Sequence, residues 1–418
     1  MQFGFGQELR YGGMPLIGSM LGAGCGLSSI SFYTHGVFVS AISHDTGWSR
    51  GDIQLGVSIM ILIAIFTAPA IGILIDRFGA RRIALISMPL YGISLASFSL
   101  VKEALWSYYL VWLVMSIIAA GTLPVTWTRV VNGWFDKYRG IALGITLAGT
   151  GIAATLGPSY VTWLVSQVGW RNSYLLLSLT IMVIALPAVY FLFSDPPNKI
   201  PTTLTQKENS NLPKQLEVPG IPFGKAIASY QFWAMGIALI FAASGISGLI
   251  TNSVPLLIDQ GISTIAAAQY AGIIGLSVIS GRLIVGILID HFWAPLIASI
   301  FLCAPAFSAL VLSGSEPSSF FISISMIVIG LSAGAELDLL AFLASRYFGL
   351  KHYGKLYGAL YVFFSIGAGI APVSFGKAFD YFGNYTFALR VVAIMSILSG
   401  FLMLTLGRYP QLTISSNH

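Results

Sequence analysis

Charged side chains are scarce in this sequence: Lys, Arg, Asp and Glu together make up 9% of the 418 residues, whereas 56% are hydrophobic. Soluble domains carry about 25% charged residues, and a soluble chain of this length with so few would expose too much apolar surface to stay in solution. The mean hydropathy of +0.83 points the same way. We therefore expect lipid, rather than water, to solvate most of the chain.

Other absences narrow the possible functions. The two cysteines, Cys25 and Cys303, fall inside apolar stretches, which indicates packed side chains rather than a disulfide framework or a metal site. The sequence has no Gly-rich phosphate loop, no metal-ligand spacing and no visible nucleophile–base set, so we expect no cofactor, no metal and no enzymatic activity. The formal net charge of +6 is spread over short segments, which does not indicate a nucleic-acid-binding face.

What the sequence does contain is twelve apolar runs, each near the roughly 20 residues that a helix needs to cross a bilayer. These runs lie near 14–39, 53–75, 82–101, 107–131, 141–165, 173–194, 226–250, 264–289, 294–313, 319–345, 355–378 and 385–407. A polar, Pro-rich segment separates six runs from six. The sequence predicts an all-α membrane protein with an N-terminal six-helix bundle at 1–194, a cytoplasmic linker at 195–222 and a C-terminal six-helix bundle at 223–418.

The distribution of Lys and Arg predicts an orientation. If the N-terminus lies inside, fourteen of these residues fall in internal segments and five in external ones. Because cytoplasmic loops carry the excess of cations, we expect both termini and the linker in the cytoplasm. The predicted protein is a multi-pass monomer in the lipid bilayer of the cell membrane, and of the bacterial inner membrane in particular.

One stretch of five residues occurs twice. The letters GILID span 72–76 and, 214 residues later, 286–290. Pro158 and Pro372 are separated by the same offset, as are Gly169 and Gly383 in the loops that follow. Several landmarks at one offset indicate two copies of a six-helix unit, related by an axis along the membrane normal as in two-bundle transporters.

The repeated stretch suggests a gating contact at a helix end. The glycine of each copy lies one turn before the aspartate, where a small residue would let a neighbouring helix approach closely. The aspartate could sit near the positive N-terminal end of another helix and lock that side in one conformation. The gating candidates are Gly72, Asp76, Arg77, Arg81, Gly286 and Asp290. The alternative is that these charges only anchor helix ends at the interface.

Several stretches of the sequence resemble those of a known family. The stretch GILIDRFGARR at 72–82 resembles the loop-2/3 signature of the major facilitator superfamily. Further stretches resemble the monocarboxylate transporter and oxalate/formate antiporter group: GWSR at 47–50, WFDKYRGIALG at 134–144, GWR at 169–171, GRLIVGILID at 281–290 and RYFG at 346–349. The resemblance implies the major facilitator fold, alternating access and a small organic anion as substrate, often moved with a proton.

Two arginines lie within or near predicted spans. A charge deep in a span costs roughly 2.5–3.5 kcal/mol on insertion scales and is a functional hypothesis by default. Arg282 could hold a carboxylate bidentately, and the resemblance implies that an arginine at this place in the eighth helix binds the substrate. The alternative is a pair with an acid of its own bundle. Arg129 is a second substrate-binding candidate, which could instead snorkel to the interface.

Glu336 and Asp338 are the only acids well inside a predicted span. Two residues apart on a helix, their side chains point about 200° apart, so both cannot face one cavity. We expect one of them to line the pathway and exchange a proton, and the other to pair within its bundle. His35 in the first span is a further proton-coupling candidate, with hydrogen-bonded packing as the alternative.

The remaining substrate-binding candidates are polar residues in or near spans, for which packing or an interfacial position is the alternative: Tyr33, Asn252, Tyr357 and Tyr361. The sequence also departs from the resembled group. Val278 stands where the animal monocarboxylate carriers have an Asp one turn before the Arg, and no Lys lies deep in the eleventh span, where oxalate/formate antiporters have one. A single buried cation suits one carboxylate better than two.

We therefore predict a secondary active transporter that moves a small, monocarboxylate-like organic anion by alternating access, coupled to H⁺. The alternative is a major facilitator exporter of hydrophobic or cationic compounds, which the two acids Glu336 and Asp338 would suit. A membrane sensor that kept the fold is a third possibility, although no appended soluble domain supports it.

Overall fold

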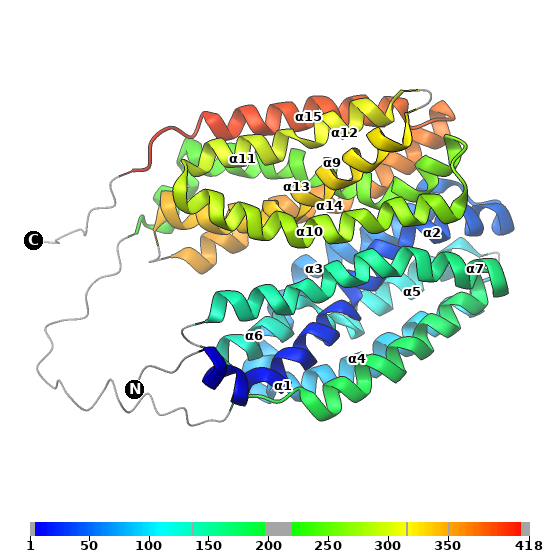
Figure 1. Ribbon diagram of the computed structural model, residues 1–418, viewed down its shortest axis with the longest axis horizontal. Helices are drawn as coiled ribbons and strands as arrows, with labels where there is room; N and C mark the ends of the chain where they lie inside the picture. The colour runs from blue at the N-terminus through cyan, green and yellow to red at the C-terminus, as the bar shows by residue number, and fades with distance from the viewer. Residues whose placement is uncertain are drawn as a thin grey trace, which may run out of the picture.

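The structure is a computed structural model that describes residues 5–102, 104–135, 138–196, 220–314, 317–349 and 352–410. Helices make up nearly all of this described chain, and Figure 1 shows them in two bundles that lie side by side. The first seven helices form one bundle and the last eight form the other. The predicted all-α fold of two helical bundles is confirmed. Most of the predicted linker at 195–222 lies outside the described residues, so the domain boundaries stay a prediction.

The N-terminal bundle contains α1 (Phe5–Gly24), α2 (Leu27–Thr46), α3 (Arg50–Phe78), α4 (Ala80–Ser97), α5 (Leu105–Ile118), α6 (Pro124–Trp134) and α7 (Arg139–Leu192). Two of its membrane crossings are each formed by two helices in succession. One consists of α1 followed by α2, and the other consists of α5 followed, after a short 3-10 turn, by α6. The 54 residues of α7 form two crossings that meet at Gly169, whose φ of 74° interrupts the helix. A glycine suits this position because it adopts a left-handed backbone at little cost.

The C-terminal bundle contains α8 (Phe223–Ile227), α9 (Tyr230–Asp259), α10 (Thr264–His291), α11 (Ala294–Cys303), α12 (Pro305–Leu312), α13 (Ser319–Phe348), α14 (Tyr353–Phe382) and α15 (Thr386–Leu404). Ten helical segments of the described chain are long and apolar enough to cross a membrane. Counting α7 as two crossings and adding the broken pair of α5 and α6 gives the twelve predicted spans. The last helix of this bundle follows Gly383, whose φ of 69° matches that of Gly169 at the equivalent place.

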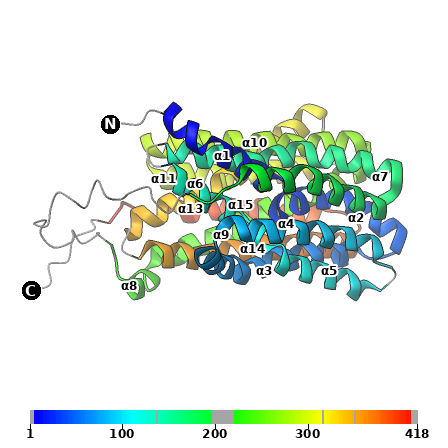
Figure 2. The same cartoon turned by 90° about the horizontal axis from the view of Figure 1, so that it is seen from below.

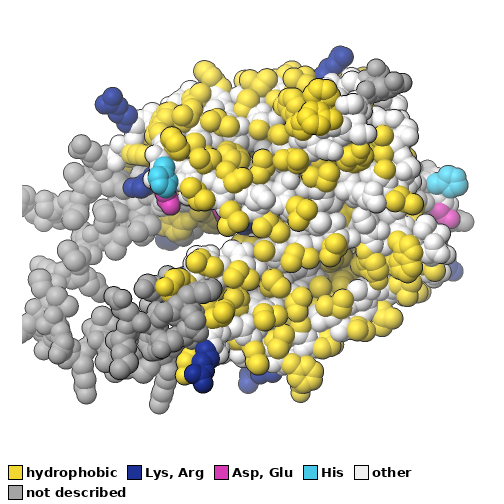
Figure 3. All heavy atoms as spheres, in the orientation of Figure 1, with side chains coloured by type: hydrophobic (Ala, Val, Ile, Leu, Met, Phe, Trp, Pro, Cys, Tyr) yellow, Lys and Arg dark blue, Asp and Glu magenta, His cyan; other side chains and the backbone are white. Residues whose placement is uncertain are grey.

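The two ends of the molecule differ. The start of α1, the end of α7, the start of α8 and the end of α15 lie at one end, which we call the terminal side (Figures 1 and 2). The turns between α2 and α3, between α9 and α10 and between α14 and α15 lie at the other end, the distal side. Figure 3 shows a hollow between the bundles that opens toward the terminal side and closes toward the distal side. The same view shows hydrophobic side chains spread over the face that it draws, as expected of a multi-pass membrane protein.

Glycines let α10 and α13 pack backbone against backbone. A Cβ on Gly334 of α13 would collide with the carbonyl oxygen of Val278 on α10, and a Cβ on Gly281 of α10 would collide with that of Leu331 on α13. Such contacts stabilise helix pairs in lipid, where the hydrophobic effect does not drive helix association. They also fix the position of Arg282, whose backbone nitrogen lies next to Gly334.

The repeated glycines, in contrast, are not packing contacts in this structure. A Cβ on Gly72 of α3 or on Gly286 of α10 would meet no atom within 4 Å. The expected close approach of a neighbouring helix is therefore absent from the described structure. Both positions face open space, not another backbone.

These two kinds of glycine give a matched stability test. We expect Gly334→Val to lower the free energy of unfolding by about 1–3 kcal/mol, because the new side chain forces α10 and α13 apart. Gly286→Val, the control on the facing helix, should stay within about 0.5 kcal/mol of the parent protein. Thermal unfolding in detergent measures both, and equal melting temperatures for the two variants would contradict the close α10–α13 contact.

Candidate functional site: a cavity between the two bundles

A cavity of about 220 Å³ lies between the two bundles. Its wall is formed by residues of α2, α3, α6 and α7 on one side and of α9, α10, α13 and α14 on the other. Among its described lining residues, Arg282 and Glu336 are the only charged ones, and most of the others are apolar. In the described part of the chain no three His, Cys, Asp or Glu side chains are grouped as a metal site.

Arg282 of α10 is incompletely paired. Its Nη1 atom lies 3.9 Å from Oδ1 of Asp338, which is beyond hydrogen-bond distance. Its Nε atom is buried and has no hydrogen-bond partner within the described residues. With 21% of its side chain exposed, the guanidinium faces the cavity with donors that an external acceptor can fill.

The two acids of α13 have different surroundings. Glu336 is buried and lines the cavity, and its Oε2 atom has no hydrogen-bond partner in the described structure. Asp338 is not part of the lining; its side chain is 39% exposed and faces Arg282 at the long distance given above. The structure thus places Glu336 on the cavity and Asp338 beside it, as their spacing on the helix requires.

Two of the predicted tyrosines line the cavity from opposite sides. Tyr33 comes from α2 and Tyr361 from α14, so each bundle supplies a phenol. Tyr357 lies one turn earlier on α14, outside the lining, and its ring stacks on that of Tyr361 at 6.3 Å between centroids. The structure therefore brings together four of the predicted residues: Tyr33, Arg282, Glu336 and Tyr361.

Two other predicted residues lie away from the cavity. His35 is buried inside the N-terminal bundle, where its ring packs edge-on against Trp112 at 5.4 Å. Asn252 of α9 is buried between the bundles and accepts a hydrogen bond of 2.8 Å from Nε2 of Gln54 on α3. The sequence pattern did not single out Gln54, although it is a polar side chain within an apolar span.

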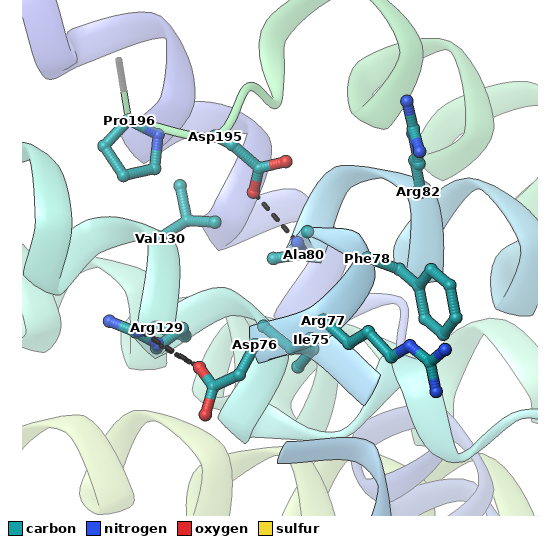
Figure 4. Close-up of a pocket in the computed structure, with 11 residues that line it drawn as sticks. Ile75, Asp76, Arg77, Phe78, Ala80, Arg82, Arg129, Val130, Asp195 and Pro196 are labelled. Carbon is teal, nitrogen blue, oxygen red and sulfur yellow. Dashed lines mark hydrogen bonds and ion pairs between the residues drawn. The ribbon is translucent and has the colours of Figure 1, made fainter. Parts of the chain in front are cut away.

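Arg129 and Asp76 meet on the terminal side. Nη2 of Arg129 on α6 lies 3.1 Å from Oδ1 of Asp76 on α3, and both side chains are exposed (Figure 4). They line a pocket of about 680 Å³ that belongs to the N-terminal bundle, together with Arg77 and Arg82. Arg129 therefore does not line the central cavity, and this structure pairs it with the gating candidate Asp76.

The N-terminus of α4, which follows Asp76 in the chain, is capped by another acidic residue. Asp195, just after α7, accepts a hydrogen bond of 2.9 Å from the backbone nitrogen of Ala80 at the start of α4 (Figure 4). It also accepts one of 3.3 Å from the backbone nitrogen of Arg81. A carboxylate there is favoured by the helix dipole. Asp290 is exposed and has no hydrogen bond or ion pair within the described residues.

The distal side is closed by an ion pair between the bundles. Arg50, the first residue of α3, donates to both oxygens of Asp259 at the end of α9, with distances of 2.5 Å and 2.8 Å. Its Nη1 atom also donates to the hydroxyl of Tyr385 at 3.0 Å, and its guanidinium lies 3.8 Å from the ring centre of Phe379. This bidentate geometry is the strongest that an arginine forms with a carboxylate.

The end of α14 adds further contacts on the distal side. Asp380 accepts hydrogen bonds from the backbone nitrogens of Arg50 at 3.0 Å and Gly51 at 2.9 Å, so its carboxylate caps the N-terminus of α3. Lys377 lies 2.8 Å from Asp52. We call the set Arg50, Asp52, Asp259, Lys377 and Asp380 the distal lock.

The distal lock breaks the symmetry of the repeat. Asp45 lies 214 residues before Asp259 and pairs within its own bundle with Arg171. The residue 214 positions after Arg171 is Tyr385, which carries no positive charge. Asp259 instead takes its cation from the other bundle. The GWSR stretch and this unmatched aspartate are the sequence signals that could have predicted the lock.

Twelve crossings in two similar bundles, with a cavity between them, define a polytopic membrane protein of the two-bundle transporter type. The chain belongs to the Major Facilitator Superfamily, whose family model matches residues 21–372. The predicted family is therefore confirmed.

Two relatives illustrate the likeness within this family. The chain is 24% identical over 356 residues to the Escherichia coli protein described as uncharacterized MFS-type transporter YhjX, covering 81% of this chain and 82% of that protein. It is 22% identical over 391 residues to human monocarboxylate transporter 11, covering 88% of this chain and 75% of the human one. Among solved structures, a mutant of the nucleoside transporter NupG matches with a TM-score of 0.72 at 15% identity, over 94% of this chain and 99% of that one.

The distal lock can be tested by the accessibility of the cavity. With Cys25 and Cys303 replaced by Ser, we introduce Ala64→Cys in the cavity wall and add a membrane-impermeant maleimide from the distal side only, in oriented vesicles. Arg50→Gln should increase the labelling rate several-fold, because it removes the bidentate pair with Asp259.

Arg171→Gln is the matched control. It breaks the equivalent pair with Asp45, which lies within one bundle, and should leave labelling from the distal side unchanged. An unchanged rate in Arg50→Gln, or an equal increase in both variants, would show that the cross-bundle pair does not hold the distal side closed.

Proposed function

We propose that the protein is a secondary active transporter that moves a small, monocarboxylate-like organic anion by alternating access, together with H⁺. Membership of the Major Facilitator Superfamily supports transport of a small molecule across a membrane. The observation that carries the anion is Arg282, an incompletely paired guanidinium in an otherwise largely apolar cavity between the bundles. The relative named as a monocarboxylate transporter is consistent with this substrate class.

An external carboxylate can compete for Arg282 in this site. A buried cation is costly unless an anion or hydrogen-bond acceptors compensate it. Asp338 compensates Arg282 only from 3.9 Å, and the buried Nε atom has no acceptor in the described structure. A bidentate carboxylate would supply the missing acceptors, with the hydroxyls of Tyr33 and Tyr361 within the same cavity.

We infer that Glu336 couples the anion to a proton. It lines the same cavity as Arg282, and one of its carboxyl oxygens has no hydrogen-bond partner in the described structure. An ionised Glu336 competes with the substrate for the positive charge of Arg282, whereas a protonated one does not. Proton and anion then occupy the cavity together. Asp338 acts from outside the lining, as the internal partner of Arg282 in the empty site.

In this proposal, alternating access is based on the difference between the terminal side and the distal side of the molecule. The structure is closed by the distal lock and hollow on the terminal side (Figure 3). In the opposite state the distal lock separates and the bundles approach on the terminal side, where Gly72 and Gly286 have free space beside them. Asp76, Arg77, Arg81 and Asp290 lie at that end and would form the closing contacts.

We also propose a membrane and an orientation. The excess of Lys and Arg in the segments on the terminal side supports a cytoplasmic location for that side, with both chain termini. The protein would then be a monomeric carrier of the bacterial inner membrane, with the distal side facing outward.

The first test is uptake of a carboxylate panel into proteoliposomes under an imposed pH gradient. Arg282→Gln should lower the apparent affinity for the transported acid by at least about thirtyfold, because it removes the partner of a buried charge, worth about 2 kcal/mol or more. Arg129→Gln, the control outside the cavity, should keep the affinity of the parent protein. An unchanged affinity in Arg282→Gln, or transport of cationic dyes without any carboxylate, would contradict the proposal.

The second test separates the two acids. Glu336→Gln should retain exchange of labelled anion between the two sides of the vesicle but lose accumulation driven by a pH gradient, because the proton site is gone while Arg282 remains. Asp338→Asn is the matched control, two residues away, and should still accumulate substrate. The reverse pattern would assign the proton to Asp338 and remove Glu336 from that role.

A further inference from the structure

We infer that the transported anion is an amphipathic acid of about seven to ten heavy atoms in all, with one carboxylate on a branched or aromatic apolar body. This inference rests on the proposed function and specifies the substrate of the same cavity. It depends on three features of that cavity: the position of its charges, its volume and its aromatic walls.

The charges of the cavity come from one bundle only. Arg282 and Glu336 belong to α10 and α13 of the C-terminal bundle. The described lining residues of the N-terminal bundle include no charged side chain, and apolar ones such as Leu27, Met60 and Leu123 predominate. A ligand whose carboxylate binds Arg282 therefore presents the rest of its body to an apolar surface.

This arrangement discriminates against dicarboxylates. A second carboxylate, held away from Arg282, would lose its hydration against Met60 and Leu123 without gaining a cation, and burial of an unpaired charge is strongly unfavourable. The arginine of the N-terminal bundle that the sequence nominated, Arg129, lies in the terminal-side pocket with Asp76. It cannot serve as the second cation in this structure.

The volume of the cavity sets a size for the whole acid, with its carboxylate included. A water molecule occupies about 30 Å³ in the liquid, so 220 Å³ corresponds to about seven water-sized groups. Acids of two or three carbons have about four to six heavy atoms and would leave part of the apolar wall without contact, which forfeits dispersion energy. A body with branches or a ring fills the space.

Both bundles supply an aromatic pair to the cavity. Phe32 and Tyr33 of α2 meet edge to face with their centroids 5.1 Å apart, and Tyr361 and Phe364 of α14 meet at 5.3 Å. All four line the cavity. Aromatic walls on two sides favour flat or branched apolar groups, with which they form stacked and edge-to-face contacts.

The aromatic wall continues toward the terminal side. From Tyr361 a row of rings runs back along one face of α14, with Tyr357 at 6.3 Å and Tyr353 at a further 5.8 Å. Because α14 begins on the terminal side, this row of rings runs from that side of the bundle to the edge of the cavity.

The experiment measures how strongly unlabelled acids inhibit the uptake of a labelled carboxylate into proteoliposomes that contain the full chain. The panel comprises acetate, lactate, 4-methyl-2-oxopentanoate, phenylacetate and succinate. We expect the apparent affinity to rise by about fourfold for each methylene group that becomes buried, and therefore by more than tenfold from acetate to phenylacetate. Succinate should compete no better than acetate.

Variants of the wall make the test specific. Phe32→Ala and Phe364→Ala should reduce the preference for phenylacetate over acetate while leaving acetate itself nearly unchanged. Phe191→Ala is the matched control and should keep the preference, because Phe191 lies on the outer face of α7 and is 76% exposed. Ala64→Leu narrows the cavity and should shift the preference toward the smaller acids.

The outcomes separate the inference from the function on which it rests. The inferred substrate class is overturned if carboxylates are transported but affinity does not rise with the size of the apolar body. It is also overturned if succinate competes as well as phenylacetate. In both cases the proposed function as a carboxylate transporter is retained. If no carboxylate competes or is transported, the proposed function fails and the inference fails with it. A preference for large acids that survives Phe32→Ala and Phe364→Ala would place the apolar body elsewhere and overturn the assignment of this wall.

Discussion

The site depends on one guanidinium that the fold holds between two bundles of apolar helices. Moving such a charge out of water costs several kcal/mol unless its surroundings compensate it. The glycine contacts between α10 and α13 hold Arg282 near Asp338, yet the two charged groups stay 3.9 Å apart and Nε has no acceptor in the described structure. Partial compensation keeps Arg282 inside the protein with donors still unfilled, as the proposed binding of an anion from outside requires.

A second constraint is the way in which the bundles meet. In the N-terminal half, Asp45 and Arg171 satisfy each other within one bundle, so that pair places no restriction on the interface. In the C-terminal half, Asp259 forms no such pair with a described cation of its own bundle and binds Arg50 of the other. The aspartate of the second copy therefore joins the two bundles on the distal side, whereas that of the first copy does not. Contacts of this kind can be exchanged for others without unfolding either bundle, as a two-state carrier needs.

Hydropathy and the repeat predicted the fold well, because the length of an apolar run and a fixed offset are properties of the chain itself. The same reasoning singled out Arg282 and Glu336, since any charge in a span is conspicuous. It could not place Asn252 or Arg129, because the neighbours of a side chain depend on which face of its helix is packed. Contacts such as Gln54 with Asn252 join residues 198 positions apart and leave no local pattern in the sequence.

The location of both cavity charges in one bundle has a consequence for the proposed transport cycle. A ligand shifts a conformational equilibrium only as far as its interactions differ between the two states. A carboxylate that binds only Arg282 contacts only the C-terminal bundle, so it does not by itself favour closure. An apolar body that also contacts Phe32 and Met60 bridges the two bundles. In the proposed cycle, therefore, the carboxylate of an amphipathic substrate would provide selection, and its apolar body would couple occupancy to movement.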